Sequence, residues 1–254
     1  MGCLYLRDRS LKEWEKDIDM LKRSYPQNVV IASIMASSKQ DWQEVARRVE
    51  GAGADIIECS FSCPHGMPER GMGSAIGQNP DLTERTAAWV KQAVDIPVVI
   101  KLTPNVTDIV AIAQAVKRSG ADGVCAINTV KTLLGIDVYT FLPVPTVAGY
   151  STYGGYSGAA IKPIALKCVS EIANNVDIEI SAVGGVSTWS DAVEFLLTGA
   201  RNVQICTAVM RWGYRIIEDL KDGLELYMKS KGCLLYTSDA ADEGLGVDLG
   251  GRRI

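Results

Sequence analysis

The sequence predicts an α/β fold, a parallel (β/α)8 TIM barrel of which about six of the eight strand–helix units are present. Short apolar runs alternate along the chain with amphipathic helical stretches, which is typical of parallel strands joined by right-handed helical crossovers. No Gly-x-Gly-x-x-Gly motif follows the first run, which weakens the alternative of an open doubly wound sheet. Polar or glycine residues stand at the ends of several runs, where the active sites of barrels lie.

Six runs rich in β-branched residues are expected to form the strands. They are nearly continuous in apolar residues, as strands buried on both faces require. The expected strands are residues 28–36, 55–62, 97–103, 123–130, 178–185 and 202–209.

Helices are expected between these strands, and several of their ends carry recognisable residues. Asn79-Pro80 places a capping asparagine before a proline at the first helical position. Thr107 is expected to cap the helix that precedes the fourth strand. Three turns from helix to strand share a Gly-Ala start, and their glycines are expected to cap helix C-termini: Gly53, Gly120 and Gly199.

Composition places the chain among single α/β domains and excludes some classes of partner. At 254 residues with 47% hydrophobic residues, it has enough apolar material for one core. A net charge of −4 argues against a nucleic-acid partner, and the sequence contains neither a membrane span nor a secretory signal, so a cytoplasmic protein is expected. The seven cysteines include no Cys-x-x-Cys pair, so we expect reduced thiols and no metal or iron–sulfur cluster in this chain.

The number of expected strands is smaller than a closed barrel requires. At roughly 31 residues per unit, two further units would need about 60 more residues. The chain opens in a helical stretch, residues 11–25, with no strand before it. We therefore expect a barrel truncated at its N-terminus.

The ends of the last two expected strands are candidates for phosphate binding. Gly184-Gly185 follows the fifth strand and Thr207 the sixth. Barrels often bind phosphate in the loops after strands seven and eight, because exposed backbone N–H groups and a helix N-terminus attract anions. A tight turn without a ligand is the alternative interpretation of the glycine pair.

Two further strand ends carry polar side chains. Lys101 ends a buried strand, where an ammonium must be paired or face a ligand because burying it alone is costly. A lysine facing solvent is the alternative. Asn128 and Thr129 combine donors and acceptors, which suits the edge of an amide-like ligand, although capping the next element would also explain them.

The segment from Cys63 to Gly77 is long and rich in glycine for a strand-to-helix connection, and we expect it to form a lid. A thiol is mostly protonated at neutral pH, so Cys63 could act as a general acid as readily as a nucleophile. A buried structural cysteine is the alternative. The single histidine, His65, is expected to shape the loop.

Five segments resemble one known family in their order and spacing. They are SCPHGMPERGMG, KLTPNVTDI, INTV, YGGYSGAAIKPIAL, and VGG followed by QICTAV. Over residues 10–232 the chain is similar to the flavin domain of the dihydropyrimidine dehydrogenases, above all to the bacterial NAD-dependent catalytic subunit.

The resemblance implies an FMN-binding barrel, related to dihydroorotate dehydrogenase, that reduces uracil and thymine with electrons from NAD(P)H. It implies that Cys63 protonates C5 of the pyrimidine while reduced FMN delivers hydride to C6. The pyrimidine would be contacted by Ser60, Asn128 and Thr129. The flavin would be contacted by Lys101, Gly158, Val183, Gly184, Gly185, Cys206 and Thr207.

The chain also departs from the pattern of this family. Ser60 stands where the motif E-L-N-x-S-C-P has asparagine, and an asparagine expected near Ser38 is not evident. The intact protein is expected to have two more strands, which carry another flavin-contacting lysine, a C-terminal iron–sulfur region and an electron-transfer partner subunit. We expect residues 1–232 to form a partial FMN-binding domain and residues 233–254 to be a non-native or disordered tail.

Two other hypotheses stay open. Oxidation of dihydroorotate on the same barrel is the nearest enzymatic one. The histidine of Cys-Pro-His-Gly, where dihydroorotate enzymes typically have asparagine, favours pyrimidine reduction. The other hypothesis is a catalytically silent truncated scaffold, because an unclosed barrel exposes strand edges and lacks part of its flavin site.

Overall fold

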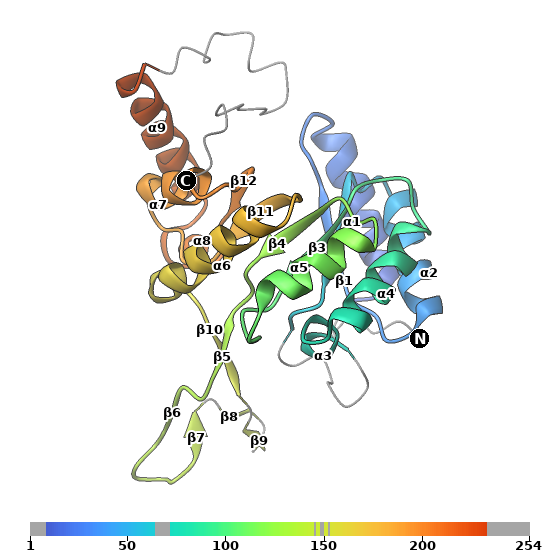
Figure 1. The fold of residues 1–254 in the computed structure, drawn as a ribbon, viewed down its shortest axis with the longest axis horizontal. Coiled ribbons are helices and arrows are strands. Elements are labelled where there is room, and N and C mark those ends of the chain that lie inside the picture. The colour runs from blue at the N-terminus through green and yellow to red at the C-terminus, as the bar shows by residue number, and fades with distance from the viewer. Residues whose placement is uncertain (1–8, 64–71, 145, 148–149, 152, 233–254) are drawn as a thin grey trace.

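A computed structural model describes residues 9–63, 72–144, 146–147, 150–151 and 153–232. Its centre is one sheet of six parallel strands (Figure 1). The strands are β1 (Ile31–Ile34), β2 (Ile56–Ser60), β3 (Val98–Leu102), β4 (Gly123–Ala126), β11 (Glu179–Val183) and β12 (Asn202–Gln204).

Each strand of this sheet lies beside its neighbour in the sequence, in the order β1-β2-β3-β4-β11-β12. A doubly wound sheet reverses direction at a switch point, whereas a barrel keeps sequential order around its wall. Among the described residues the order never reverses. The predicted fold class is therefore confirmed as an α/β half-barrel of six parallel strands.

The predicted strands were too long at their C-terminal ends. β4 ends at Ala126 and β12 at Gln204, although the backbone N–H groups of Ile127 and Asn128 still donate to Val183 and Leu102 of the neighbouring strands. Apolar residues continue past these strand ends because the loops at the rim are themselves buried, as Ile127 is. An apolar run therefore marks burial rather than strand pairing.

Helices connect the strands and cover one face of the sheet (Figure 1). They are α1 (Leu11–Ser24), α2 (Lys39–Gly51), α3 (Ser74–Gly77), α4 (Pro80–Lys91), α5 (Ile109–Arg118), α6 (Lys162–Asn175), α7 (Trp189–Leu197), α8 (Thr207–Trp212) and α9 (Arg215–Ser230), with a short 3₁₀ turn, η2 (Ala159–Ile161).

One of the two predicted helix N-caps is confirmed and the other is wrong. Asn79 caps α4, and its Oδ1 accepts from the backbone N–H of Leu82 at 3.0 Å. The prediction that Thr107 caps α5 is wrong, because the cap is Asp108. The Asp108 carboxylate accepts from two backbone N–H groups, at 2.9 and 3.1 Å, and so satisfies two donors of the first turn.

The glycines of the three helix-to-strand turns adopt the left-handed conformation that the sequence predicts. Gly53, Gly120 and Gly199 have φ values of +99°, +82° and +108° and lie just after the ends of α2, α5 and α7. A residue with a Cβ is strained there. These turns return each helix to the start of the next strand.

The two faces of the sheet differ in chemistry because successive side chains of a strand point in opposite directions. Ile57, Cys59 and Ile100 pack with helix side chains in the apolar core. The opposite face carries Glu58 and Lys101 from the same two strands. The helix layer thus stabilises one face and leaves a polar face for chemistry.

The described residues between 130 and 156 form an arm of short antiparallel pairs that leaves the sheet, as Figure 1 shows, and the sequence analysis did not predict it. Its pairs are β5 (Val130–Thr132) with β10 (Gly154–Tyr156), β6 (Gly135–Ile136) with β7 (Pro143–Val144), and β8 (Thr146–Val147) with β9 (Tyr150–Ser151). Apolar and polar residues do not alternate regularly here, so the run carried no strand signal.

Most of the predicted lid, residues 64–71 with His65, lies outside the described residues, as does the predicted tail 233–254. The returning part of the lid is described and packs closely. Met72 is buried, and a Cβ at Gly77 would meet the backbone oxygen of Phe61 at 2.1 Å. Within the described ranges no helix is both long and apolar enough to cross a membrane.

The contact between Trp42 and Phe61 generates a prediction about stability. Both side chains are fully buried, and their rings meet edge to face with centroids 5.4 Å apart. We expect Trp42→Ala to lower the free energy of unfolding by about 3–5 kcal/mol, measured by urea denaturation. The control is Trp212→Ala on exposed α8, which we expect to change it by about 0.5 kcal/mol or less. Equal losses in both variants would contradict this.

Candidate active site

All but two of the site residues predicted from the sequence line one cavity of about 170 Å³ at the C-terminal rim of the sheet. The elements that carry them are far apart in sequence but adjacent in space, because the carboxyl ends of parallel strands meet at one edge. The predicted residues in this cavity are Lys101, Asn128, Thr129, Gly158, Val183, Gly184, Gly185, Cys206 and Thr207.

Three glycines of the cavity have backbone conformations that exclude ordinary side chains. Gly158, Gly184 and Gly185 have φ values of +84°, +135° and +84°. A Cβ at Gly185 would lie 2.8 Å from the backbone nitrogen of Lys162, and one at Gly184 would lie 2.8 Å from the Cβ of Ala165. These positions therefore require glycine, and their bare backbone forms part of the cavity wall.

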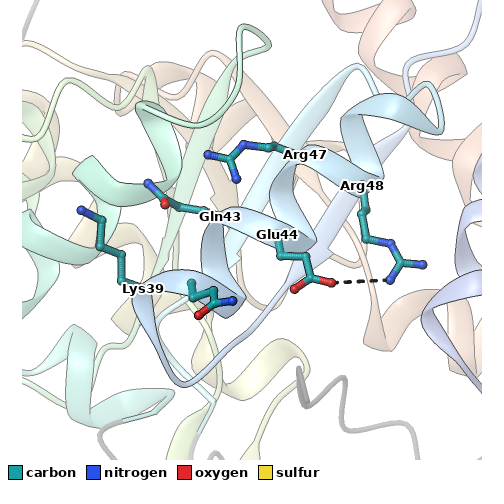
Figure 2. Close-up of a pocket in the computed structure, with 6 residues that line it drawn as sticks. Lys39, Gln43, Glu44, Arg47 and Arg48 are labelled. Atoms are coloured by element: carbon teal, nitrogen blue, oxygen red, sulfur yellow. Dashed lines mark ion pairs between the residues drawn. The ribbon is translucent and has the colours of Figure 1, made fainter.

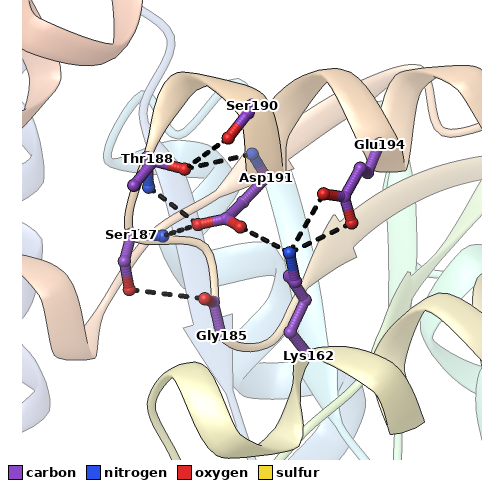
Figure 3. Close-up of polar contacts among 7 residues, drawn as sticks. All are labelled: Lys162, Gly185, Ser187, Thr188, Ser190, Asp191 and Glu194. Carbon is purple, nitrogen blue, oxygen red and sulfur yellow. Dashed lines mark hydrogen bonds and ion pairs between the residues drawn. The ribbon is translucent and has the colours of Figure 1, made fainter.

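The loop after β11 is held by the ion-pair network in Figure 3. Lys162 Nζ lies 2.6 Å from the carboxylate of Asp191 and 3.0 Å from that of Glu194. The other oxygen of Asp191 accepts from the backbone N–H groups of Ser187 and Thr188, at 2.9 and 2.8 Å. This network fixes the glycine pair relative to α6 and α7.

Charge and hydrogen bonding keep this network ionised. The bond to Asp191 raises the pKa of Lys162 despite partial burial. Burial acts to raise the pKa of Asp191, but its bonds to Lys162, Ser187 and Thr188 outweigh burial and lower it overall. Both groups therefore carry charge at neutral pH, and their ion pair holds the loop.

Hydroxyl groups line the far side of the same cavity. Thr207 begins α8, and its Oγ1 donates to the Oγ of Ser157 at 3.1 Å. Both residues line the cavity with the glycines. Hydroxyls, glycine backbone and the start of a helix together suit an anion such as phosphate.

Lys101 points from β3 toward this cavity and is paired behind it. Its Nζ lies 3.3 Å from Oε1 of Glu58, and its side chain is only 21% exposed. Burial by itself lowers the pKa of Lys101, but the neighbouring Cys125 and the carboxylate of Glu58 raise it, and the net direction is upward. The interpretation of Lys101 as a lysine facing solvent is therefore wrong, and the ammonium is charged at neutral pH.

Asn128 and Thr129 follow β4 and connect the cavity to the loop after β2. Asn128 Nδ2 donates to the Oγ of buried Ser62 at 2.8 Å, and its Oδ1 accepts from the backbone N–H of Thr129 at 2.7 Å. Asn105 Nδ2 in turn donates to the backbone oxygen of Thr129 at 3.3 Å. Asn128 is thus fixed next to the residue that precedes Cys63.

Ser60 and Cys63 line a different cavity. It has a volume of about 520 Å³ and lies between α1 and β1, with Trp14, Ile18 and Ser33 among its other lining residues. Ser60 is nevertheless the register partner of Lys101 across the β2–β3 ladder. The two cavities therefore adjoin across neighbouring strands, which lie about 4.8 Å apart.

Sequence reasoning missed Gln204, which lines the cavity, and Glu58, which lies behind it. Gln204 lines the cavity and donates to the carboxylate of Glu58 at 3.4 Å. A signal was present, since an acid in DIIECSFS, a base in VVIKLT and an amide in NVQICTAV each interrupt an apolar strand. Polar residues in buried strands must be paired, and their opposite charges indicated partners.

A third hollow lies on the outer surface of α2 (Figure 2). Its lining residues all belong to this helix, and Glu44 pairs with Arg48 across one turn at 3.9 Å. Such exposed pairs on one helix are common at protein surfaces. We therefore place the candidate active site at the rim of the sheet.

Known proteins are similar to this chain over most of its length. Residues 1–228 match the sequence profile described as dihydroorotate dehydrogenase. The chain is 45% identical over 230 residues to the NAD-dependent dihydropyrimidine dehydrogenase subunit PreA of Escherichia coli (strain K12), across 89% of this chain and 56% of that protein. It is 44% identical over 231 residues to the chloroplastic dihydropyrimidine dehydrogenase (NADP(+)) of Arabidopsis thaliana, across 88% and 54%.

A third relative has another named activity. It is the catalytic subunit of dihydroorotate dehydrogenase B (NAD(+)) from Methanothermobacter thermautotrophicus, 41% identical over 232 residues, across 91% of this chain and 73% of that protein. The chain spans about half the length of the two dihydropyrimidine dehydrogenases it matches. With the profile matched over most of its length, the chain belongs to the dihydroorotate dehydrogenase family.

Proposed function

We propose that this chain is the FMN-binding catalytic part of a dihydropyrimidine dehydrogenase, which reduces uracil and thymine to the 5,6-dihydro bases. One observation carries the proposal: residues from the ends of β3, β4, β11 and β12 converge on one cavity of glycine backbone, hydroxyls and a buried cation. The higher identity to two dihydropyrimidine dehydrogenases than to a dihydroorotate dehydrogenase supports the choice of substrate.

The residues of the cavity fit the chemistry of FMN. Gly158, Gly184 and Gly185 leave space that a Cβ would fill, and with Thr207 they would hold the phosphate end. Lys101 would contact the polar edge of the flavin ring, where its charge favours the negatively charged reduced form, beside Val183 and Cys206 of the same wall. At about 170 Å³ this cavity is smaller than a typical cofactor pocket of about 300–1,000 Å³, so we assign it only part of the cofactor.

In the proposed reaction, two electrons and two protons enter the C5–C6 double bond of the pyrimidine. FMN, when bound, supplies hydride to C6. The Cys63 thiol donates its proton to C5. The electron pair of the broken double bond forms the new C5–H bond, and the thiolate is then reprotonated from water. Asn128, Thr129 and Ser60 would hold the polar edge of the base during this transfer.

The position of Cys63 supports its role as the acid. It lies directly after β2 and is partly exposed in a cavity that adjoins the proposed flavin site. Its backbone oxygen accepts from Ser74 at 3.1 Å, and the neighbouring Ser62 is bonded to Asn128. These bonds hold the Cys63 backbone oxygen and the Ser62 side chain in place beside the thiol.

The electrons would come from NAD(P)H through a partner subunit and through iron–sulfur clusters of the intact protein. The Escherichia coli relative is named an NAD-dependent subunit, which supports a partner and a nicotinamide donor. We further propose that residues 1–232 form the flavin domain and that residues 233–254 lie outside it. The family match, which ends at residue 228, supports that boundary.

The first prediction concerns FMN itself. We expect the purified chain to bind FMN with one-to-one stoichiometry, measured by quenching of flavin fluorescence. Gly185→Val should weaken binding at least tenfold, because its side chain would collide with the backbone of Lys162. Gly135→Val is the control, since a Cβ at Gly135 meets nothing within 4 Å. A chain that folds but binds no FMN would support the silent scaffold instead.

The second prediction concerns the proton donor. In the intact complex, Cys63→Ala should lower the rate of uracil reduction by about 10²–10⁴-fold, as expected for loss of a general acid. Reduction of the flavin by NAD(P)H should continue, which stopped-flow absorbance would record. The control is Cys168→Ala, a buried thiol of α6 outside both cavities. Unchanged turnover in Cys63→Ala would remove the proposed role.

The third prediction separates the two substrate classes. If the site is built for pyrimidine reduction, uracil should be turned over and dihydroorotate should not compete with it at equal concentration. Steady-state assays with both compounds in one mixture measure this preference. Turnover of dihydroorotate in preference to uracil would favour the dihydroorotate dehydrogenase alternative.

A further inference from the structure

Glu58 is a buried carboxylate on which three donors converge. The residue is 6% exposed and lies on β2, on the face of the sheet away from the helices. Its Oε1 lies 3.3 Å from Lys101 Nζ and 3.3 Å from Ser33 Oγ, and its Oε2 lies 3.4 Å from Gln204 Nε2. A charge buried at this depth is costly unless such partners compensate it.

This arrangement requires a side chain that only accepts hydrogen bonds. A carboxylate has acceptors on both oxygens, whereas a glutamine of the same length would turn an NH₂ group toward either Lys101 or Gln204. Both of those neighbours are donors, so one contact would become repulsive. Size alone therefore does not explain why a glutamate stands at position 58.

Glu58 acts on the proposed flavin site from one step behind it. Lys101 and Gln204 line the cavity, and Glu58 does not. Of the three donors of the Lys101 ammonium, Glu58 engages one, which leaves others for a ligand. The Glu58 carboxylate thus sets the position of the Lys101 ammonium without occupying the side of it that faces the cavity.

The orientation of Gln204 follows from the same carboxylate. Its Nε2 donates to Glu58 and, at 3.0 Å, to Ser181 Oγ, which in turn donates to Asn202 Oδ1 at 2.6 Å. Because both amide hydrogens are committed, the carbonyl oxygen is the group of Gln204 left to accept from a ligand. The wall of the cavity therefore presents the ammonium of Lys101 and the carbonyl oxygen of Gln204, and Glu58 orients both groups.

We propose that Glu58 is a positioning residue that orients Lys101 and Gln204 toward the flavin ring. Resting on the proposed function, this inference extends it to a residue that touches neither cofactor nor substrate. The ring of FMN has both acceptor and donor groups at its polar edge, which match a cation and a carbonyl oxygen. Loss of Glu58 should leave these two partners present but misdirected.

The experiment is a double-mutant cycle on FMN binding in the full chain, with Glu58→Gln, Lys101→Met and the double variant. We expect Glu58→Gln to weaken FMN binding about tenfold when Lys101 is present and less than twofold in Lys101→Met. The flavin reduction potential should become more positive in Glu58→Gln, because one negative charge leaves a site where the reduced flavin gathers negative charge. A purely structural role would not produce that coupling.

The matched control is Asp55→Asn, which removes a carboxylate that is paired with a lysine directly before the same strand begins. Asp55 lies 2.9–3.0 Å from Lys22 Nζ and accepts from the backbone N–H of Val30 at 2.7 Å. We expect Asp55→Asn to lower the thermal midpoint of unfolding and to leave the FMN dissociation constant and the flavin reduction potential unchanged. Equal effects of Asp55→Asn and Glu58→Gln on FMN would overturn the inference.

The possible failures are distinguishable. If the unaltered chain folds but binds no FMN, the proposed function fails and the role of Glu58 fails with it. If the unaltered chain binds FMN and Glu58→Gln binds it equally well, only the role of Glu58 fails. The same holds if Glu58→Gln weakens FMN binding as much in the Lys101→Met background as when Lys101 is present. Should Glu58→Gln not fold, Glu58→Asp replaces it, and a shortened carboxylate that leaves FMN affinity unchanged would also refute the inference.

Discussion

The in-order parallel pairing of six strands is the constraint on which the rest of the structure depends. Each ladder places residues distant in sequence side by side, as with Ser60 and Lys101 or Lys101 and Cys125. Because every strand runs in the same direction, all carboxyl ends meet at one rim. The cavity there is completed by Thr207 at the start of α8, and α6 and α7 hold its glycine loop in place.

Successive side chains along each strand point to opposite faces of the sheet, so one face stabilises the fold and the other carries the polar residues of the site. One face of the sheet packs against helices and is apolar, which stabilises the fold. The other face can carry Glu58, Lys101 and Gln204 only because they satisfy one another. The ion pair of Lys162 with Asp191 plays a corresponding part outside the sheet, since it holds the loop whose glycines line the cavity. The site thus depends both on the burial of the apolar face and on the pairing of its charged groups.

Several features of the site escaped prediction for identifiable reasons. The cap of α5 was placed one residue early, because Thr107 and Asp108 are both acceptable caps and only backbone geometry selects between them. Ser60 and Cys63 were expected beside the flavin residues, yet the structure puts them in the adjoining cavity, on the other side of a strand boundary. Register between strands, which sets such boundaries, is not encoded in any single segment.

Local patterns were enough to predict the fold class, the six strands of the central sheet, the glycine turns and most residues of the rim cavity. These follow from local chemistry: apolar runs favour strands, glycines permit left-handed turns, and polar residues at strand ends mark a rim. Which residues meet was set by the tertiary fold. That Glu58 faces Lys101 and Gln204, rather than solvent, depends on pairing across strands separated by 43 and 146 positions in the chain. Long-range register therefore supplied the partners that local patterns leave open.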